Sequence, residues 1–284
     1  MAKWNGSLTC SMTRWTPDRV WDAVDAWRWI PPSAVRVSTD EYDLAVTPGS
    51  YALTYVYDFH LAEADLVDAR LADLRSHIES LGGTGARFRL TSRSRPSDLA
   101  EHLRRAGYRQ VEDADVLVWE LRSEDGALRL PNFPAPEGVA VREVGTDPEF
   151  ERFLELSSVI FGDPPPSEET RAAFRLEFRR KLTEDGHSDR FIAWMGENPI
   201  GRAGLEIVGP VARFWGTGVL TEHRRRGVYG ALVRARCEAA AQRGAEIALA
   251  TARVGTSGPI LRRHGFKAMG TTQMFEVRWD DQAG

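Results

Sequence analysis

The stretch from Gly218 to Val233 combines residue types that favour binding of a phosphate group. A strand-like run ends near Leu220, the basic turn Arg224–Arg226 follows, and an amphipathic helix begins after Gly227. The first N–H groups of a helix lack intrahelical acceptors, and the helix dipole makes that end positive. Gly227 and Gly230 would let a ligand approach the backbone closely. The pattern therefore predicts an anion site at this turn.

A plainer interpretation of the same turn is a solvent-exposed arginine run beside a helix start. The helix dipole contributes only about 0.3–1 kcal/mol, so arginine contacts and several N–H bonds would have to supply most of the affinity. The spacing differs from G-x-x-x-x-G-K-[ST], which excludes a P-loop for nucleoside triphosphates. From the residues alone, the anion site and the exposed run both stay open.

Two segments resemble the GNAT superfamily of acyl-CoA-dependent N-acyltransferases. Residues 224–233 (RRRGVYGALV) resemble the family's Arg/Gln-x-x-Gly-x-Gly/Ala turn, and residues 259–266 (PILRRHGF) look like its helix and Gly-Phe ending. The two segments stand in the family's order, with one helix and one strand between them. The resemblance covers about residues 138 to 279 and implies a domain that binds acetyl-CoA as co-substrate.

The resemblance also implies which residues bind the coenzyme. The N–H groups from Arg225 to Gly230 would hold its pyrophosphate, and the end of the preceding strand would pair with the pantetheine amides. The predicted coenzyme-binding residues are Val219, Leu220, Arg224, Arg225, Arg226, Gly227, Val228, Tyr229, Gly230 and Ser257. Tyr229 departs from the family pattern, which has glycine or alanine there. Its side chain either reshapes the phosphate contact or packs on the helix face.

Catalytic residues are less clearly marked. An amine with a pKa of about 10.4 is neutral in only about one molecule in 10³ at pH 7, so a base or a desolvating pocket is needed. The resemblance makes Glu206 the candidate base, and an outward-facing strand carboxylate is the alternative. The family's usual acid, a tyrosine before Gly-Phe, is replaced by Leu261. Water, Ser257, Thr256 or a residue from elsewhere would then protonate the thiolate.

Other reactive side chains have plainer interpretations. Cys237 lies in an Ala/Arg/Glu helix context and is expected to pack rather than to attack a substrate. His264 is expected to cap a helix end, and His223 either touches the phosphates or has a structural role in the turn. Cys10 and Cys237 form no disulfide framework, and no His, Cys, Asp or Glu grouping has metal-ligand spacing. No metal is therefore expected.

Aromatic side chains are candidates for an acceptor cleft between the two halves of the chain, although most are expected in the core. The candidates in the second half are Phe161, Trp194, Phe214 and Trp215, with the loop Pro164–Pro166. Those in the first half are Tyr55, Tyr57, Asp58 and His60. For this second group a half-buried strand edge is the favoured interpretation.

Regular elements must position these residues. Thr16-Pro17 predicts a helix start, with Thr16 as N-cap. Residues 67–81 carry apolar side chains at 4-3-4-3 spacing and predict a long helix. The second half predicts strands near 190–195, 200–208, 211–220 and 247–252, a helix over 228–243 and a short helix over 259–263.

An internal repeat organises the chain. Leu103–Tyr108 (LRRAGY) matches Leu261–Phe266 (LRRHGF) at an offset of 158 (261 − 103), within the same order of elements. We therefore predict an α/β (α+β) protein of two tandem GNAT-like domains, each a mixed, mostly antiparallel sheet flanked by helices. The predicted boundaries are 1–123 for a degenerate copy, 124–137 for a Pro-rich linker and 138–284 for the acetyl-CoA-binding copy.

The first copy is predicted to lack the coenzyme site. The same offset places Leu66–Ala72 over Arg224–Gly230. That segment has no glycine, and Asp68 stands where Arg226 lies. A carboxylate at this helix start would repel a pyrophosphate.

Composition supports a globular protein of two domains. The chain has 284 residues, 42% hydrophobic and 27% charged, which excludes a disordered chain. The formal charge of −4 gives no general attraction to nucleic acid or to a membrane surface. The N-terminus lacks a signal peptide and no run is long enough to span a bilayer, so a cytoplasmic, bacterial protein is expected, monomeric or homodimeric.

Together these patterns predict an N-acetyltransferase. It would move the acetyl group of acetyl-CoA to a primary amine of a small molecule by direct attack in a ternary complex. The alternative is a non-catalytic acyl-CoA-binding or sensing protein, which Leu261 and Tyr229 suggest.

Overall fold

The computed structural model describes residues 15–26, 30, 34–47, 53–61, 66–123, 125–162 and 164–279, so Cys10 and the side chain of Asp58 lie outside the description. The helices are α1 (Pro17–Asp25), α2 (Val67–Ser80), α3 (Leu99–Arg105), α4 (Asp147–Phe161), α5 (Glu168–Glu184), α6 (Val228–Gln242) and α7 (Ser257–Arg263), with a 3-10 turn η2 (Thr221–His223). The strands are β1 (Val35–Ser38), β2 (Tyr42–Val46), β3 (Thr54–Phe59), β4 (Gly85–Leu90), β5 (Arg109–Glu120), β6 (Val139–Glu143), β7 (Arg190–Met195), β8 (Asn198–Val208), β9 (Val211–Val219), β10 (Ile247–Arg253) and β11 (Lys267–Arg278).

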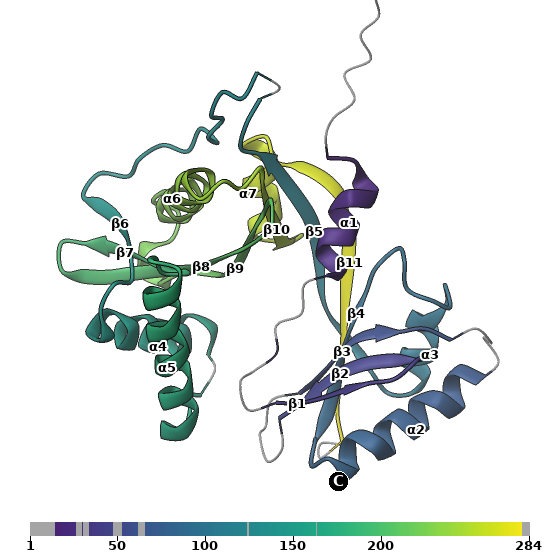
Figure 1. Ribbon diagram of the computed structural model, residues 1–284. Coiled ribbons are helices and arrows are strands. Elements are labelled where there is room, and N and C mark those ends of the chain that lie inside the picture. Colours follow the sequence, from purple (N-terminus) through teal and green to yellow (C-terminus); the bar gives the residue numbers. More distant parts are fainter. Residues whose placement is uncertain are drawn as a thin grey trace, which may run out of the picture.

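The strands of the described ranges form one 11-stranded sheet in the order β1-β2-β3-β4-β11-β5-β10-β9-β8-β7-β6. Strands β3 and β4 are parallel, as are β9 and β10, and the other neighbours in this order run antiparallel. The predicted mixed, mostly antiparallel architecture flanked by helices is confirmed. The two halves share one continuous sheet (Figure 1).

The two halves exchange their last strands. β5 ends the first half, yet it pairs with β10 of the second. β11 ends the second half, yet it lies between β4 and β5 of the first. Figure 1 shows the yellow β11 running beside the dark β5 at the middle of the sheet. Each half therefore completes its sheet with a strand from the other.

The pairing of β5 with β11 follows the internal repeat. The offset of 158 makes Arg109 the counterpart of Lys267, and Val118 the counterpart of Glu276. The register pairs Lys267 with Val118 and Glu276 with Arg109. Interchanging the two strands therefore leaves their pairing unchanged, as a local two-fold axis requires.

Two further features of β5 and β11 obey the same symmetry. Ala114 pairs with its own counterpart Thr272, which places the axis beside this pair. Each strand also has a register irregularity, one that skips Val111 and one that skips Met269, and these positions are counterparts too. Two unrelated irregularities would not be expected at equivalent positions, so the geometry supports an origin by duplication.

Alternation along the strands divides the core of the second half into two layers. Leu117 of β5 packs with Leu232 of α6 and Leu261 of α7 on one face. Its neighbours Val116 and Val118 point to the opposite face and pack against α1. Further along that second face, α4 and α5 cover β7 through a cluster that includes Phe153 and Phe178. In the first half, α2 and α3 cover β2–β4 and β11.

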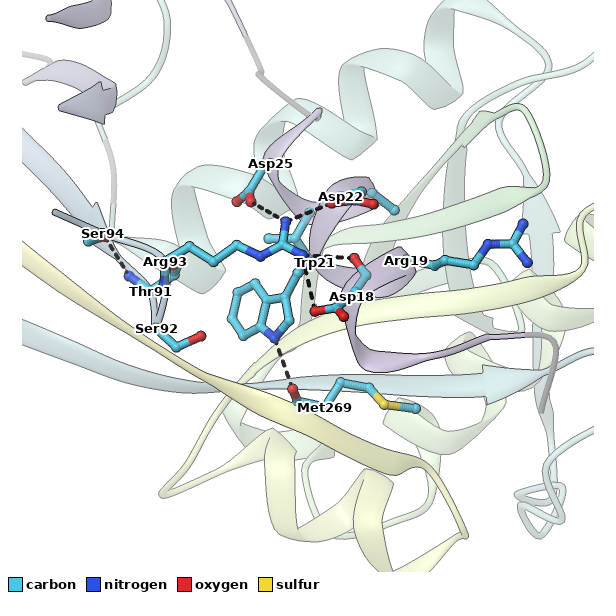
Figure 2. A network of polar contacts seen from close by, with 12 residues as sticks. Asp18, Arg19, Trp21, Asp22, Asp25, Thr91, Ser92, Arg93, Ser94 and Met269 are labelled. Carbon is cyan, nitrogen blue, oxygen red and sulfur yellow. Dashed lines mark hydrogen bonds and ion pairs between the residues drawn. The ribbon is translucent and has the colours of Figure 1, made fainter. Parts of the chain in front are cut away.

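Helix α1 lies across the shared strands. Thr16 caps its N-terminus by accepting a hydrogen bond from Arg19 N–H, as predicted. The Trp21 indole donates to Met269 O at 3.0 Å, at the irregularity of β11 (Figure 2). Gly270 has no side chain where the Trp21 ring packs, and a Cβ there would lie 2.6 Å from the ring. The helix thus packs directly on the exchanged strand.

Charged contacts hold α1 to both halves. The Arg93 guanidinium, in the loop after β4, donates to Asp22 at 2.7 Å and to Asp25 at 3.3 Å (Figure 2). At the C-terminus of α1, Arg89 of the first half donates to Val24 O. Arg213 of the second half donates to the adjacent carbonyl oxygen, that of Ala23. Cations are favourable at this end of a helix because its carbonyl groups carry partial negative charge.

The predicted domain boundaries at 123 and 138 stay a prediction. Residue contacts at the boundary are extensive, because β5 and β11 each belong to the sheets of both halves.

Candidate functional site

The turn before α6 has the geometry of an open helix start. Gly227 is the N-cap with φ 83°, and no side chain accepts a hydrogen bond from the first turn. The first helical bond runs from Ala231 N–H to Gly227 O at 3.0 Å, so the preceding N–H groups, up to that of Gly230, have no helical acceptor. Arg225 has φ 61°, the left-handed region that non-glycine residues rarely adopt. The side chains of Arg224–Arg226 are exposed.

This turn fits an anion on physical grounds. Its backbone N–H groups converge at the positive end of a 15-residue helix, and three guanidinium groups stand beside it. The left-handed residues at 225 and 227 curl the backbone, which is the geometry of concave anion-binding loops. A pyrophosphate is an anion of suitable charge for these groups.

The strand end before the turn already has partners within the protein. Arg224 Nε donates to Val219 O at 3.1 Å. Leu220 N–H donates to Ile200 O at 3.0 Å. The edge of β9 that faces β10 is different, since parallel pairing stops at Phe214 and Ala250 although both strands continue. We call the space between the strands beyond this pair the β9–β10 fork.

An irregularity in β9 accompanies the fork. Against β8, Arg202 pairs with Gly218 and Gly204 pairs with Trp215, so β9 has one extra residue in between. Gly216 in that segment has φ 53°. A bulge of this kind increases the local twist and turns the bulged strand away from its neighbour.

Tyr229 points into the protein rather than toward the phosphate turn. Its ring packs against the core of the second half. Burial raises the pKa of Tyr229, while the charge of Arg236 acts in the opposite direction. Of the two predicted roles for this side chain, the structure favours packing.

Gly230 makes room for a protein side chain. A Cβ at this position would lie 2.5 Å from the ring of Phe133, which belongs to the predicted linker. Phe133 is buried and lies with its ring centroid 4.0 Å from that of His264, at the end of α7. His264 Nδ1 also contacts Asn132 O at 2.9 Å. The linker therefore packs along the groove between α6 and α7.

Glu206, the predicted base, stands opposite Arg213 in the β8–β9 ladder. Arg213 is 5% exposed, and its burial lowers its pKa, while the charge of Glu206 opposes that shift. This arrangement gives Glu206 a role in balancing a buried cation. Its predicted role as a base stays a prediction.

The predicted aromatic candidates lie on opposite faces of the sheet. The Arg236 guanidinium lies 4.0 Å from the ring centroid of Phe214 on the α6 face. Trp215 packs edge-on against Phe153 of α4 on the other face. On that face Arg202 is buried over the Phe153 ring at 3.8 Å, and it also donates to the Ser157 hydroxyl. Phe161, at the end of α4, is 43% exposed, and Trp194 of β7 packs with the α4–α5 cluster.

Tyr57 and His60 do not approach the α6 turn. They line a cavity of about 160 Å³ in the first half, together with Arg89 of β4 and Thr91, which directly follows that strand. Tyr55 stacks on Tyr57 with ring centroids 5.9 Å apart. This cavity lies where the parallel pairing of β3 and β4 ends, so it is the first-half equivalent of the β9–β10 fork.

The remaining candidates for reactive side chains are Cys237, His264 and His223. Cys237 is fully buried, and burial raises the pKa of its thiol to about 12, which fits a packing role. The backbone of His264 forms the C-cap of α7, as predicted. The Nδ1 atom of His223 is buried without a hydrogen-bond partner among the described residues. Those residues also contain no group of three metal-ligating side chains and no helix that could cross a membrane.

Sequence reasoning missed two residues of the site. Arg236 is 1% exposed and donates to Leu232 O and Gly204 O, both at 3.0 Å. Its position on the apolar face of a helix, one turn after Leu232, was the available signal. Phe133 was the other omission, since an aromatic residue within a Pro-rich linker indicates an anchored rather than a free segment.

Part of the second half matches a known protein family. Residues 150–260 match the family model described as "Acetyltransferase (GNAT) family". A search of curated proteins gave no match. The matched range runs from α4 into α7, and so contains the turn and the fork.

Solved structures share the fold. A GCN5-related N-acetyltransferase from Sphaerobacter thermophilus aligns with TM-score 0.61 and 18% identity, over 84% of this chain and 81% of that one. One from Kribbella flavida aligns with TM-score 0.59 and 20% identity, over 86% and 89%. A tandem GNAT protein from the clavulanic acid biosynthesis pathway aligns with TM-score 0.58 and 15% identity, over 92% and 88%. At these identities the likeness concerns the fold alone.

Proposed function

Because residues 150–260 match the model of the GNAT acetyltransferase family, we propose that this chain is an N-acetyltransferase whose second half binds acetyl-CoA. The observation that carries the proposal is the open start of α6, where a left-handed Gly227 and the exposed Arg224–Arg226 offer an anion both N–H donors and positive charge. The acceptor is the primary amine of a small molecule, and the acetyl group passes to it by direct attack.

Each predicted residue has a task in this proposal. The N–H groups from Arg225 to Gly230 hold the pyrophosphate, and the free edge of β9 at Val219 orients the pantetheine arm. The fork receives the thioester and shields it from water. Glu206 takes the proton that the attacking amine loses. Val228 and Ser257 contribute backbone and side-chain contacts from the first turns of α6 and α7.

A second function, acyl-CoA binding without catalysis, is supported by one observation. Leu261 is completely buried in the core of the second half. It offers no proton to a departing thiolate at the position where the family resemblance implies a tyrosine. Under this alternative the protein binds the coenzyme and releases no free thiol.

The two functions separate in a paired assay. Calorimetry measures acetyl-CoA binding to the full chain, and release of free thiol is followed with a panel of primary amines. Binding together with amine-dependent thiol release supports the acetyltransferase. Binding without thiol release from any amine favours the alternative.

The coenzyme site itself is tested by Gly227→Asp. The added carboxylate would stand at the helix start, where it repels a pyrophosphate and also strains a backbone with φ 83°. We expect affinity for acetyl-CoA to fall by about 10²-fold or more, which corresponds to loss of the contacts to one charged group. Gly244→Asp, beyond the other end of α6, adds the same charge at the same φ of 83° in open space and should keep the affinity. Equal affinity of the Gly227→Asp variant would refute the assignment of this turn.

A further inference from the structure

The cavity of the first half lies in the gap between β3 and β4. Parallel pairing of these strands ends at Val56 and Phe88. Both strands continue beyond that pair, to Phe59 and Leu90. At the repeat offset of 158, Val56 is the counterpart of Phe214, which ends the pairing of β9 with β10 in the same way. Both halves therefore have an opening between parallel strands at equivalent positions.

This cavity has an apolar end and a charged end. Successive side chains of a strand point to opposite faces of the sheet, yet Phe88, Arg89 and Leu90 all line the cavity, so it reaches both faces. On the face covered by α2 and α3, its walls are buried apolar side chains, those of Val56, Phe59, Phe88, Leu90 and Leu99. On the face where α1 ends, it is lined by Arg89, Arg93 and Asp25. A ligand with an apolar body and a charged head matches this division.

The cation that faces a ligand at the charged end is Arg89. Arg93 is already paired with carboxylates, since it donates to Asp22 at 2.7 Å and to Asp25 at 3.3 Å (Figure 2). Arg89 Nη2 donates instead to a neutral acceptor, Val24 O, at 3.3 Å. A guanidinium has several N–H donors in one plane, and a carboxylate can accept two of them side by side. The head group is therefore expected to be a carboxylate.

A second arginine makes an anion favourable at this place. Burial lowers the pKa of Arg213, Glu206 opposes that shift, and the charge of Arg89 lowers the pKa further. Arg89 and Arg213 both donate to carbonyl groups at the end of α1, so their charges lie near each other. A carboxylate bound to Arg89 would reduce the repulsion between them.

The start of α2 disfavours a ligand that carries phosphate groups. Asp68 stands in the first turn of α2, and its carboxylate lies 2.6 Å from His102 Nδ1 and 3.7 Å from Arg105 Nη1. The basic side chains at this helix start are thus already beside an anion of the protein, which would repel a pyrophosphate. The ligand of this half is therefore expected to be smaller than a coenzyme and to lack phosphates.

Volume limits the apolar body. The cavity measures about 160 Å³, and an apolar cavity of about 150 Å³ is large enough for benzene. The rings of Phe59 and Phe88 meet edge-on with centroids 5.6 Å apart, and a third aromatic ring can pack on such a pair.

We propose that the gap between β3 and β4 is a binding site for a small monocarboxylate. Its apolar body, about the size of one benzene ring, lies against Phe59 and Phe88, and its carboxylate binds Arg89. The site is separate from the coenzyme turn of the second half, and the inference does not depend on acetyl transfer.

Calorimetry on the full-length chain tests the ligand class, with benzoate as the probe. Benzyl alcohol keeps the ring without the charge, acetate keeps the charge without the ring, and benzylamine reverses the charge. We expect benzoate to bind with a Kd of about 1 mM or tighter, and each of the other three to bind at least about 10-fold more weakly.

Variants locate the site. Arg89→Met should weaken benzoate binding by about 10-fold or more, because a charge-assisted hydrogen bond is lost. Arg109→Met is the matched control, since Arg109 is exposed and does not line the cavity. Val56→Phe adds a ring from the apolar wall and should abolish benzoate binding. Should that variant fail to fold, the two arginine variants still decide. Gly227→Asp, in the other half, should keep the affinity for benzoate.

Four results would overturn the inference. Benzoate without saturable binding up to about 10 mM removes the ligand class. Benzylamine that binds as tightly as benzoate assigns the head group to a cation. Equal affinity of Arg89→Met and Arg109→Met removes the residue that defines the charged end. Displacement of benzoate by coenzyme A, or loss of benzoate binding in Gly227→Asp, places it in the second half. A chain that binds benzoate as expected but no acetyl-CoA would reject the proposed function and leave this site standing.

Discussion

Because the last strands are exchanged, we expect the two halves to unfold as one unit, and Gly85 offers a test. Gly85 of β4 pairs with Arg278 of β11, at the point where the first half receives its exchanged strand. A Cβ added at Gly85 would lie less than 3.0 Å from Val277 O and 2.5 Å from the Leu53 side chain. Gly85→Ala should therefore force β4 and β11 apart.

The cost can be worked from these contacts. Ordinary contacts to a Cβ begin near 3.4 Å, and the closest neighbour is a backbone oxygen that is fixed by its own strand pairing. Overpacking of a well-ordered site costs about 1–3 kcal/mol, and loss of a ladder hydrogen bond adds about 1 kcal/mol. We expect a loss of about 3 kcal/mol, which lowers the urea midpoint by about 1 M for a slope near 3 kcal/mol/M.

Hydrogen exchange distinguishes shared from separate stability. If both halves unfold together, amides of β2 in the first half and β7 in the second should lose protection by the same factor, about 10² for 3 kcal/mol. Gly255→Ala is the matched control, because its Cβ would meet nothing within 4 Å. Its free energy of unfolding should stay within about 0.5 kcal/mol of the original. Faster exchange in β2 with unchanged exchange in β7 would refute the reasoning.

Three further predictions concern single side chains. Glu206→Gln should remove the acid limb of the pH–rate profile and lower kcat by about 10²–10⁴-fold if Glu206 is the base; an unchanged profile excludes it. Burial alone would raise the pKa of Glu151, but hydrogen bonds from two arginines of α5 outweigh it and the pKa is lowered. The resulting stability is present above the unfolded pKa of about 4.3 and is lost as pH falls through the lower folded value. Thermal melts of Glu151→Gln should therefore change less over that range, and equal slopes would contradict the ion pairs. In a Cys10→Ser background, Cys237 should react with a thiol reagent at pH 8 only after unfolding, because burial raises its pKa to about 12; rapid native labelling would be the contrary result.

Local patterns predicted the elements well because they depend on neighbours along the chain. The apolar spacing of residues 67–81 and the cap at Thr16 each specify one helix with one buried face, and both are present. The choice of partner strand, in contrast, does not depend on neighbours along the chain. The consecutive apolar residues Val116, Leu117 and Val118 indicate a strand that is covered on both faces, but this pattern does not depend on which strands pair with β5. The exchange therefore could not be derived from periodicity.

The candidate site also has parts that the sequence could predict and parts that it could not. The turn at Gly227 was predictable because glycine, arginine and a helix start are adjacent in sequence. The direction of the Tyr229 side chain was not, since it depends on core residues from other elements of the second half. Gly230 illustrates the limit. The sequence predicted that a ligand approaches its backbone, and the structure shows the ring of the linker residue Phe133 there instead.

The local two-fold axis between β5 and β11 bears on ancestry. If the linker is removed in thought, two similar chains remain, each of which gives its final strand to the other. That is the description of a strand-swapped homodimer, in which identical copies meet across a closed, self-complementary interface. Gene fusion of such a dimer would free one copy to diverge, because the other could keep the ligand site while both still complete a common sheet. A half without the coenzyme site, as predicted for the first half, would then persist because its partner has no complete sheet without it.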